Sequence, residues 1–256
     1  MPIKLLKNFL LNNKLFVRFY LTTLRKFHLL WVNRERKIYR KIAKALNDKS
    51  GLEIGGPSPI FEISGPTPFY KIVKNLDNIN FSDKTSWDDN KDGGDFIFNQ
   101  NKASGRQIIT DATNLSAIND NQYEFLLSCH NLEHIANPIK AILEWKRVLK
   151  TDSFIVLVLP NKWHTYDINR PFTKIRHLID DFENNIQETD DTHAQEVIEM
   201  FDVHLDSTVT SLKEHIKRTA QNFDNRVMHH HVFDVELIKD VFKYVEIEYI
   251  DSEIFD

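Results

Sequence analysis

The sequence predicts a doubly wound α/β fold with a mostly parallel sheet. Short apolar segments recur along residues 50–160 at the spacing of βα units, and polar residues follow them. Gly55 and Gly56 come after the first segment, where paired glycines let the chain turn tightly and approach a ligand. Residues 154–159 form an uninterrupted apolar run, which is typical of a central strand buried on both faces.

The predicted strands are the apolar segments bounded by polar residues or proline. In chain order they cover residues 52–54, 77–81, 106–110, 123–129, 154–159 and 244–250. The last alternates in polarity, which predicts an edge strand. Residues 84–107 are polar and include a glycine pair, so we expect a loop with at most one short strand. Residues 150–153 are expected to form a turn.

The predicted helices are the segments whose apolar residues recur every three or four positions. They cover residues 34–46, 69–76, 137–149, 173–182, 193–201, 212–223 and 232–242. Four prolines crowd residues 57–68, so the helix that should follow the first strand is expected to be short or replaced by a loop. Residues 161–228 are longer than a connection should be, which predicts a helical cover over the substrate.

Length and composition are typical of a soluble globular protein with one domain and appendages. The chain has 256 residues, of which 41% are hydrophobic and 27% charged. Its single cysteine, Cys129, excludes an internal disulfide and fits a reducing compartment. No cysteine or histidine spacing is typical of a structural zinc site.

Charge divides the chain into a basic arm, residues 1–49, and an acidic domain, residues 50–256. Residues 1–50 carry a net charge of +11, and the total of −4 leaves −15 for the rest. Residues 3–32 have an amphipathic helical stripe but no uncharged run long enough to span a membrane. Such an arm could bind an anionic membrane surface or pack over its own domain, while the acidic domain disfavours nucleic acid. The oligomeric state is left open.

Several short motifs follow one another in a specific order. They are Glu53-x-Gly55-Gly56, Asp77-Asn78-Ile79-Asn80-Phe81-Ser82, Ile109-Thr110-Asp111-Ala112, Leu132-Glu133-His134-Ile135 and Glu144-x-x-Arg147-Val148-Leu149-Lys150. This order resembles the class I S-adenosylmethionine-dependent methyltransferases, and the last two motifs resemble a branch whose members often act in glycan assembly. The resemblance covers residues 51–249. It implies a Rossmann-like fold and S-adenosylmethionine as cofactor.

The resemblance also implies a set of cofactor-binding residues at the strand ends. Asp111 would accept from the adenine amino group, and the backbone N–H of Ala112 would donate to the ring. Asn80 stands where the family usually has a carboxylate for the ribose hydroxyls, and an amide binds there less strongly. The full predicted set is Glu53, Gly55, Gly56, Asn80, Ser82, Asp111, Ala112 and His130.

Methyl transfer to a hydroxyl needs a general base, because a hydroxyl is a poor nucleophile until its proton is removed. Histidine is best matched to this task at neutral pH. His164 directly follows the strand at 154–159, and Asp167 could orient its ring, so we expect this pair to act as the base. Glu133 and His229 are further candidates, and by resemblance Glu133 points toward the methyl donor.

Two residues are predicted to bind substrate. Arg170 could hold an anionic substrate group or pair with Asp167, and His230 is a second candidate. The run of histidines at 229–231 does not predict a metal site, because adjacent histidines do not converge on one ion without a sharp turn.

These observations together predict an S-adenosylmethionine-dependent methyltransferase that modifies an oxygen of a sugar in a surface polysaccharide or lipid-linked glycan. A small metabolite is the alternative acceptor. A catalytically silent, membrane-associated binding module of the same fold is the alternative class of protein. We expect a cytoplasmic protein, which the arm could hold on the inner face of the membrane.

Overall fold

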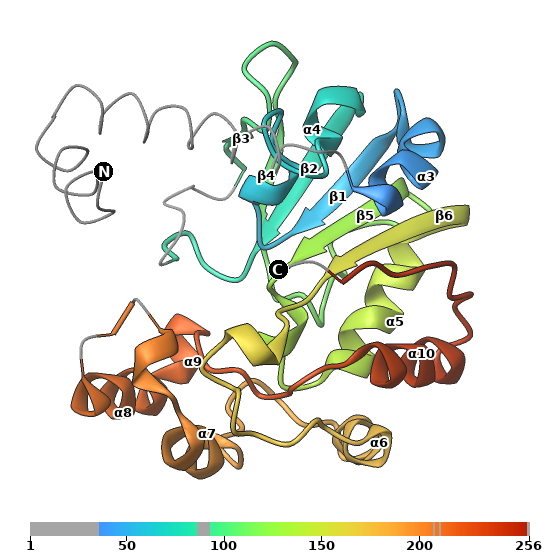
Figure 1. Cartoon of the computed structure of the whole chain (residues 1–256). Helices are drawn as coiled ribbons and strands as arrows, with labels where there is room; N and C mark the ends of the chain where they lie inside the picture. Colours follow the sequence, from blue (N-terminus) through green and yellow to red (C-terminus); the bar gives the residue numbers. More distant parts are fainter. Residues whose placement is uncertain (1–35, 86–92, 207, 210, 255–256) are drawn as a thin grey trace, which may run out of the picture.

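A computed structural model of the chain describes residues 36–85, 93–206, 208–209 and 211–254. Figure 1 shows a sheet with helices on both faces and a separate group of helices beyond one end of it. The predicted doubly wound, mostly parallel fold is therefore confirmed. The amphipathic helix expected in residues 3–32 lies outside the described residues.

The sheet has six strands in the order β3-β4-β2-β1-β5-β6. Their bounds are β1 Ser50–Ile54, β2 Asn75–Asn80, β3 Asp95–Phe96, β4 Gly105–Ile109, β5 Tyr123–Cys129 and β6 Leu149–Val158. All neighbouring pairs are parallel except β3 with β4, so five carboxyl ends open on the same edge. The strands expected at 77–81, 106–110 and 123–129 are present within two residues at each boundary.

The predictions for residues 150–153 and 244–250 are wrong. Residues 150–153 are part of β6, which starts at Leu149 and accommodates Asp152 at φ +60° beside a register shift against β5. Residues 245–254 contain no strand: Val245 is buried and Ile247 and Tyr249 pack against the core, but the segment pairs with no strand of the sheet. Its acidic side chains reach α3 instead: Glu253 accepts from the backbone N–H of Ile38 at 3.0 Å and Asp251 from Lys41 at 2.9 Å.

Helices cover both faces of the sheet and enclose two apolar cores. One face carries α3 (Lys37–Leu46), the one-turn helix α4 (Phe69–Ile72) and the 3₁₀ turn η1 (Pro59–Phe61). The other carries α5 (Pro138–Val148) and α10 (Val235–Tyr244), with Trp145 fully buried between them and the sheet. The four prolines confine α4 to one turn, as expected.

The helix α3 packs on the domain although it belongs to the basic arm by charge. Tyr39, Ile42 and Leu46 are buried on its inner face, and the rings of Tyr39 and Phe69 lie 5.1 Å apart. The alternative in which the arm docks on its own domain therefore holds for residues 37–46.

Beyond the carboxyl edge, the described part of residues 161–228 forms a group of short helices, which we call the cover (Figure 1). Its elements are η3 Lys162–His164, α6 Ile175–Glu183, α7 Ala194–Met200, η4 Val203–Leu205, α8 Leu212–Ala220 and α9 Asn222–Asn225. The helix expected at 212–223 is divided at Gln221, where the backbone leaves helical geometry. The cover joins the domain mainly where α6 packs on α5 and α10.

Asn137 ties α5 to this cover, and its loss should destabilise the fold. Its buried side chain caps α5 by accepting from the N–H of Lys140 and donates to the carbonyls of Asp181 and Ile186. We expect Asn137→Ala to lower the free energy of unfolding by about 2 kcal/mol, the upper end for a helix cap. Urea unfolding would measure this. Ser211→Ala, which removes a solvent-exposed cap with a single bond to Glu214, should cost about 0.5 kcal/mol.

Candidate active site

A cavity of about 420 Å³ lies at the carboxyl ends of β1, β2, β4 and β5. Ligands bind at this edge in open α/β sheets, and the volume is within the range of small-molecule sites. Five of the predicted cofactor-binding residues line it: Gly55, Asn80, Asp111, Ala112 and His130.

The turn after β1 requires glycine at position 55. Gly55 has φ +79°, and its N–H donates to the carbonyl of Ile79 at 2.8 Å. A Cβ at this position would lie 2.4 Å from Nδ2 of Asn131. The backbone can therefore form one wall of the cavity only without a side chain. The side-chain oxygen of Asn131 is buried there and has no hydrogen-bond partner among the described residues.

Glu53 and Gly56 support this turn from beneath rather than lining the cavity. Glu53 is fully buried and accepts from the hydroxyls of Ser58 and Tyr70, both at 2.6 Å. Burial raises the pKa of Glu53 to about 7, against the opposing effect of these bonds. The N–H of Gly56 donates to the side chain of Asn78 at 2.9 Å. The structure therefore gives both residues a role in positioning the turn.

The polar ends of β2 and β4 lie next to this turn. Asn80 is buried and donates to the carbonyl of Gly56 at 3.2 Å, which fixes the orientation of its amide. Asp111 accepts from the N–H and hydroxyl of Thr113, and the carbonyl of Ala112 accepts from Trp145. Ser82 lies outside the cavity lining, and its hydroxyl contacts the N–H of Lys84.

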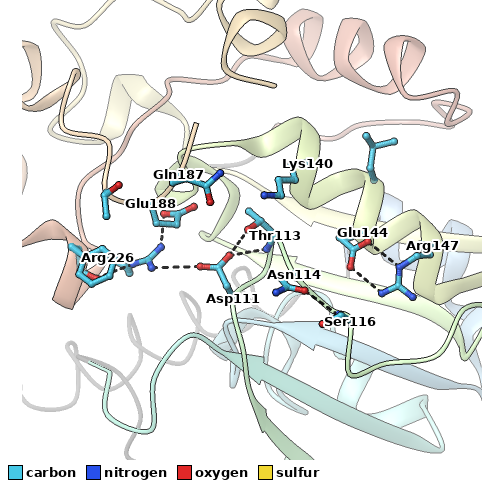
Figure 2. Close-up of a pocket in the computed structure, with 13 residues that line it drawn as sticks. Asp111, Thr113, Asn114, Ser116, Lys140, Glu144, Arg147, Gln187, Glu188 and Arg226 are labelled. Carbon is cyan, nitrogen blue, oxygen red and sulfur yellow. Dashed lines mark hydrogen bonds and ion pairs between the residues drawn. The ribbon is translucent and has the colours of Figure 1, made fainter. Parts of the chain in front are cut away.

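A residue of the cover reaches into the site, which the sequence did not predict. Arg226 lies 3.5 Å from a carboxylate oxygen of Asp111 and also pairs with Glu188, as Figure 2 shows. These three residues line both the strand-end cavity and an adjoining open hollow of about 970 Å³ toward α5. No sequence signal marks Arg226, because its position depends on how the cover folds back over the sheet.

After β5 the chain places a buried acidic side chain behind the cavity wall. Glu133 lies in η2 (Leu132–His134), and neither of its carboxylate oxygens has a hydrogen-bond partner among the described residues. Ring nitrogens of His130 and His134 lie 3.8 and 3.9 Å from it. Burial raises the pKa of Glu133 to about 7, with nearby His229 acting in the opposite direction.

The predicted pairing of Asp167 with His164 is wrong. One carboxylate oxygen of Asp167 is hydrogen bonded to Nδ1 of His229, and the other accepts from Arg170 at 2.8 Å. Asp167 and His229 are buried, whereas His164 is exposed at the end of η3. The ring of His229 stacks edge-on against His134, at a centroid distance of 4.6 Å. Asp167 thus orients a histidine that contacts the cavity wall.

The two predicted substrate-binding residues have structural partners instead. Arg170 is 98% buried and bonds to Asp167, to Glu196 and to the backbone carbonyls of residues 229 and 230. His230 is fully buried, and one of its ring nitrogens lies 3.1 Å from the amide of Asn222. Both side chains therefore form contacts within the protein that join residues 229–230 to the cover.

The fold and the strand-end cavity can now be compared with known proteins. The family model of a methyltransferase domain matches residues 94–157, which is a quarter of the chain. No curated protein matches. Among solved structures, a methyltransferase from Thermotoga maritima is 14% identical, with coverage of 91% of this chain and 79% of that one and a TM-score of 0.42.

Two further solved structures are more partial matches. A methyltransferase from Methanosarcina mazei is 20% identical, with coverage of 48% of this chain and 59% of that one and a TM-score of 0.35. One from Aquifex aeolicus is 14% identical, with coverage of 46% and 62% and a TM-score of 0.33. The chain thus spans less than two thirds of both proteins.

Two observations indicate that the strand-end cavity could hold S-adenosylmethionine. The turn at Gly55 has no room for a side chain, and the buried oxygen of Asn131 lacks a partner there. The match of residues 94–157 to a methyltransferase domain, the mostly parallel sheet and the glycine turn at its carboxyl edge agree with the resemblance of the sequence to class I S-adenosylmethionine-dependent methyltransferases.

Proposed function

We propose that this chain methylates a hydroxyl oxygen, with His229 as general base and Asp167 as the residue that positions it. The observation that carries this proposal is the buried hydrogen bond between Asp167 and Nδ1 of His229, next to the cofactor cavity. S-adenosylmethionine, when bound, would supply a methyl group on a good leaving group, so the protein must align the acceptor and remove its proton.

The arrangement supports oxygen as the acceptor atom. An aliphatic hydroxyl must lose its proton as the new bond forms, and a histidine held by a carboxylate is suited to take it. Glu133, His134 and His229 each place a nitrogen or oxygen within 4.8 Å of the others. When Glu133 is ionised, its carboxylate can stabilise the imidazolium that forms on His229.

A sugar is the acceptor class that we propose. Its support is the resemblance of the Leu132-Glu133-His134-Ile135 and Glu144-x-x-Arg147 motifs to a branch common among glycan-assembly enzymes. The basic arm would hold the protein near a lipid-linked or surface glycan, as its charge of +11 in residues 1–50 favours an anionic membrane. Within the part of the chain that the structure describes, no helix is long and apolar enough to cross a membrane.

The test is methyl transfer from radiolabelled S-adenosylmethionine to separated cell fractions. We expect label in polysaccharide or lipid-linked glycan that resists alkali, as a sugar ether does, and that appears in an O-methyl sugar after acid hydrolysis. Label in small metabolites would favour the alternative acceptor. If the protein binds S-adenosylmethionine but labels no fraction, the catalytically silent module is the better description.

A further inference from the structure

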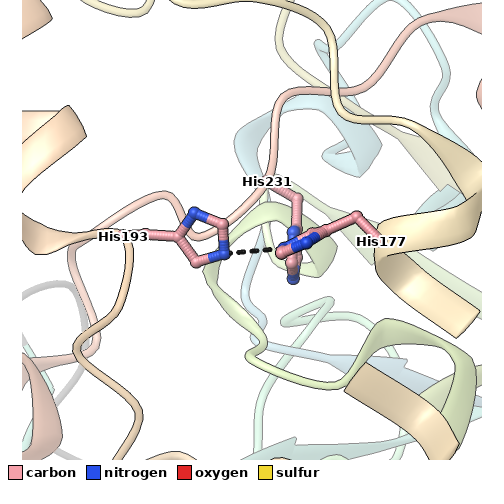
Figure 3. A group of neighbouring side chains, drawn as sticks. All are labelled: His177, His193 and His231. Atoms are coloured by element: carbon pink, nitrogen blue, oxygen red, sulfur yellow. Dashed lines mark hydrogen bonds between the residues drawn. The ribbon is translucent and has the colours of Figure 1, made fainter. Parts of the chain in front are cut away.

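Three histidines from distant parts of the sequence meet on the cover, away from the cofactor cavity. His177 lies on α6, His193 caps α7, and His231 belongs to the segment that leads into α10. Their ring nitrogens lie within 4.8 Å of one another, and Nε2 of His177 is 3.0 Å from Nε2 of His193 (Figure 3).

A carboxylate completes this group. Asp181 lies one turn after His177 on α6, and its Oδ2 is 3.4 Å from Nε2 of His177 and 3.7 Å from Nε2 of His231. That oxygen is buried and has no hydrogen-bond partner among the described residues. The fully buried His231 has its Nε2 3.3 Å from the carbonyl oxygen of Ala136. An unpaired buried polar atom costs about 1–3 kcal/mol, so a ligand that satisfied Oδ2 of Asp181 would stabilise the cover.

Three of the six separations in this group are close to those between ligands of a tetrahedral zinc ion. Bonds of about 2.0–2.1 Å at tetrahedral angles place neighbouring ligand atoms roughly 3.3 Å apart. The three measured separations, 3.0, 3.4 and 3.7 Å, lie on both sides of this value. Histidine nitrogens together with one carboxylate oxygen are a suitable donor set for zinc.

His231 is buried and His193 is partly buried, so the group is largely shielded from solvent. His177 is 41% exposed, which leaves a path for the ion to enter from solvent.

We propose that His177, Asp181, His193 and His231 bind a zinc ion that holds the cover together. The ion would join α6, the start of α7 and the segment before α10. With four protein ligands the site has no open position for a substrate, so its role is structural. None of the four residues lines the cofactor cavity. The zinc site thus shares no residue with that cavity or with the Asp167–His229 pair.

The first measurement is the zinc content and zinc affinity of the full chain after removal of any histidine tag. We expect one zinc ion per chain by elemental mass spectrometry. His177→Ala should weaken zinc binding by more than about 100-fold, above the 10–100-fold typical for loss of a residue that only supports a ligand. His204→Ala is the matched control, because His204 is an exposed histidine elsewhere on the cover, and it should bind zinc like the wild type.

Two further measurements keep the proposal testable if a variant folds poorly. The wild-type chain loaded with cobalt should show the intense visible absorption of a tetrahedral site. Saturating zinc at about 100 times its Kd should raise the Tm of the apo chain by roughly 5–10 °C. Substoichiometric zinc in the wild type, or equal zinc affinity in wild type and His177→Ala, would overturn the proposal.

Discussion

His229→Gln is expected to reduce methyl transfer by about 10²–10⁴-fold, which corresponds to roughly 3–5 kcal/mol in the activation barrier. Glutamine has a similar volume and can accept a hydrogen bond, but it cannot take up a proton. The backbone carbonyl of His229, which accepts from Arg170 at 2.9 Å, is retained in this variant. Single-turnover kinetics with labelled cofactor would measure the loss, and the affinity for S-adenosylmethionine should change by less than about threefold.

His164→Ala is the matched comparison, because His164 is exposed and belongs to the same cover. We expect it to retain turnover close to that of the wild type. If His164→Ala abolishes turnover while His229→Gln does not, His164 is the base and the proposed role of the Asp167–His229 pair is wrong. Asp167→Asn should show an intermediate loss, since Asp167 acts only by holding the histidine ring.

The dependence of turnover on pH tests whether Glu133 assists His229. The pKa of Glu133 is raised to about 7, so the carboxylate is protonated below that pH and ionised above it. If the ionised form assists His229, turnover should rise as pH increases through 7. Glu133→Gln should lower the activity and remove the part of this rise that Glu133 contributes, because an amide does not titrate. An unchanged profile in Glu133→Gln would exclude this assistance.

The fold and the cofactor cavity could be predicted because their signals are local. Each parallel strand carries its own apolar run, and the residue after it must lie at the carboxyl edge whatever the rest of the chain does. Gly55, Asn80 and Asp111 therefore come together from sequence order alone. The segment at 244–250 failed because alternation predicts an extended conformation but not a pairing partner.

The sequence could not identify His229 as the proposed base, because the position of its ring depends on a contact with Asp167 across the cover. Asp167 and His229 are 62 residues apart, and several turns and helices lie between them. His164 is three residues from Asp167, so sequence proximity favoured it, yet η3 turns His164 toward solvent. Arg170 was predicted either to hold an anionic substrate group or to pair with Asp167, and the structure shows the pair with Asp167. Here four polar groups surround its guanidinium.

The second large effect is expected from Gly55→Ala, which should weaken S-adenosylmethionine binding by about 100-fold, or 2.7 kcal/mol. The added Cβ would fall 2.4 Å from Nδ2 of Asn131 and would force either the turn or Asn131 to move into the cavity. The positive φ of +79° adds strain, because a residue with a Cβ in this region costs about 1–2 kcal/mol. Titration calorimetry of the folded variant would measure the affinity.

Gly93→Ala tests the effect of a positive φ angle without the steric clash that a Cβ at position 55 makes with Asn131. Gly93 has a similar φ of +70°, but an added Cβ there would meet no described residue within 4 Å, and Gly93 does not line the cavity. We expect Gly93→Ala to lower the free energy of unfolding by about 1 kcal/mol and to leave cofactor affinity unchanged. Equal affinities in Gly55→Ala and Gly93→Ala would mean that the turn after β1 does not contact the cofactor. The cavity at the strand ends would then not be the binding site.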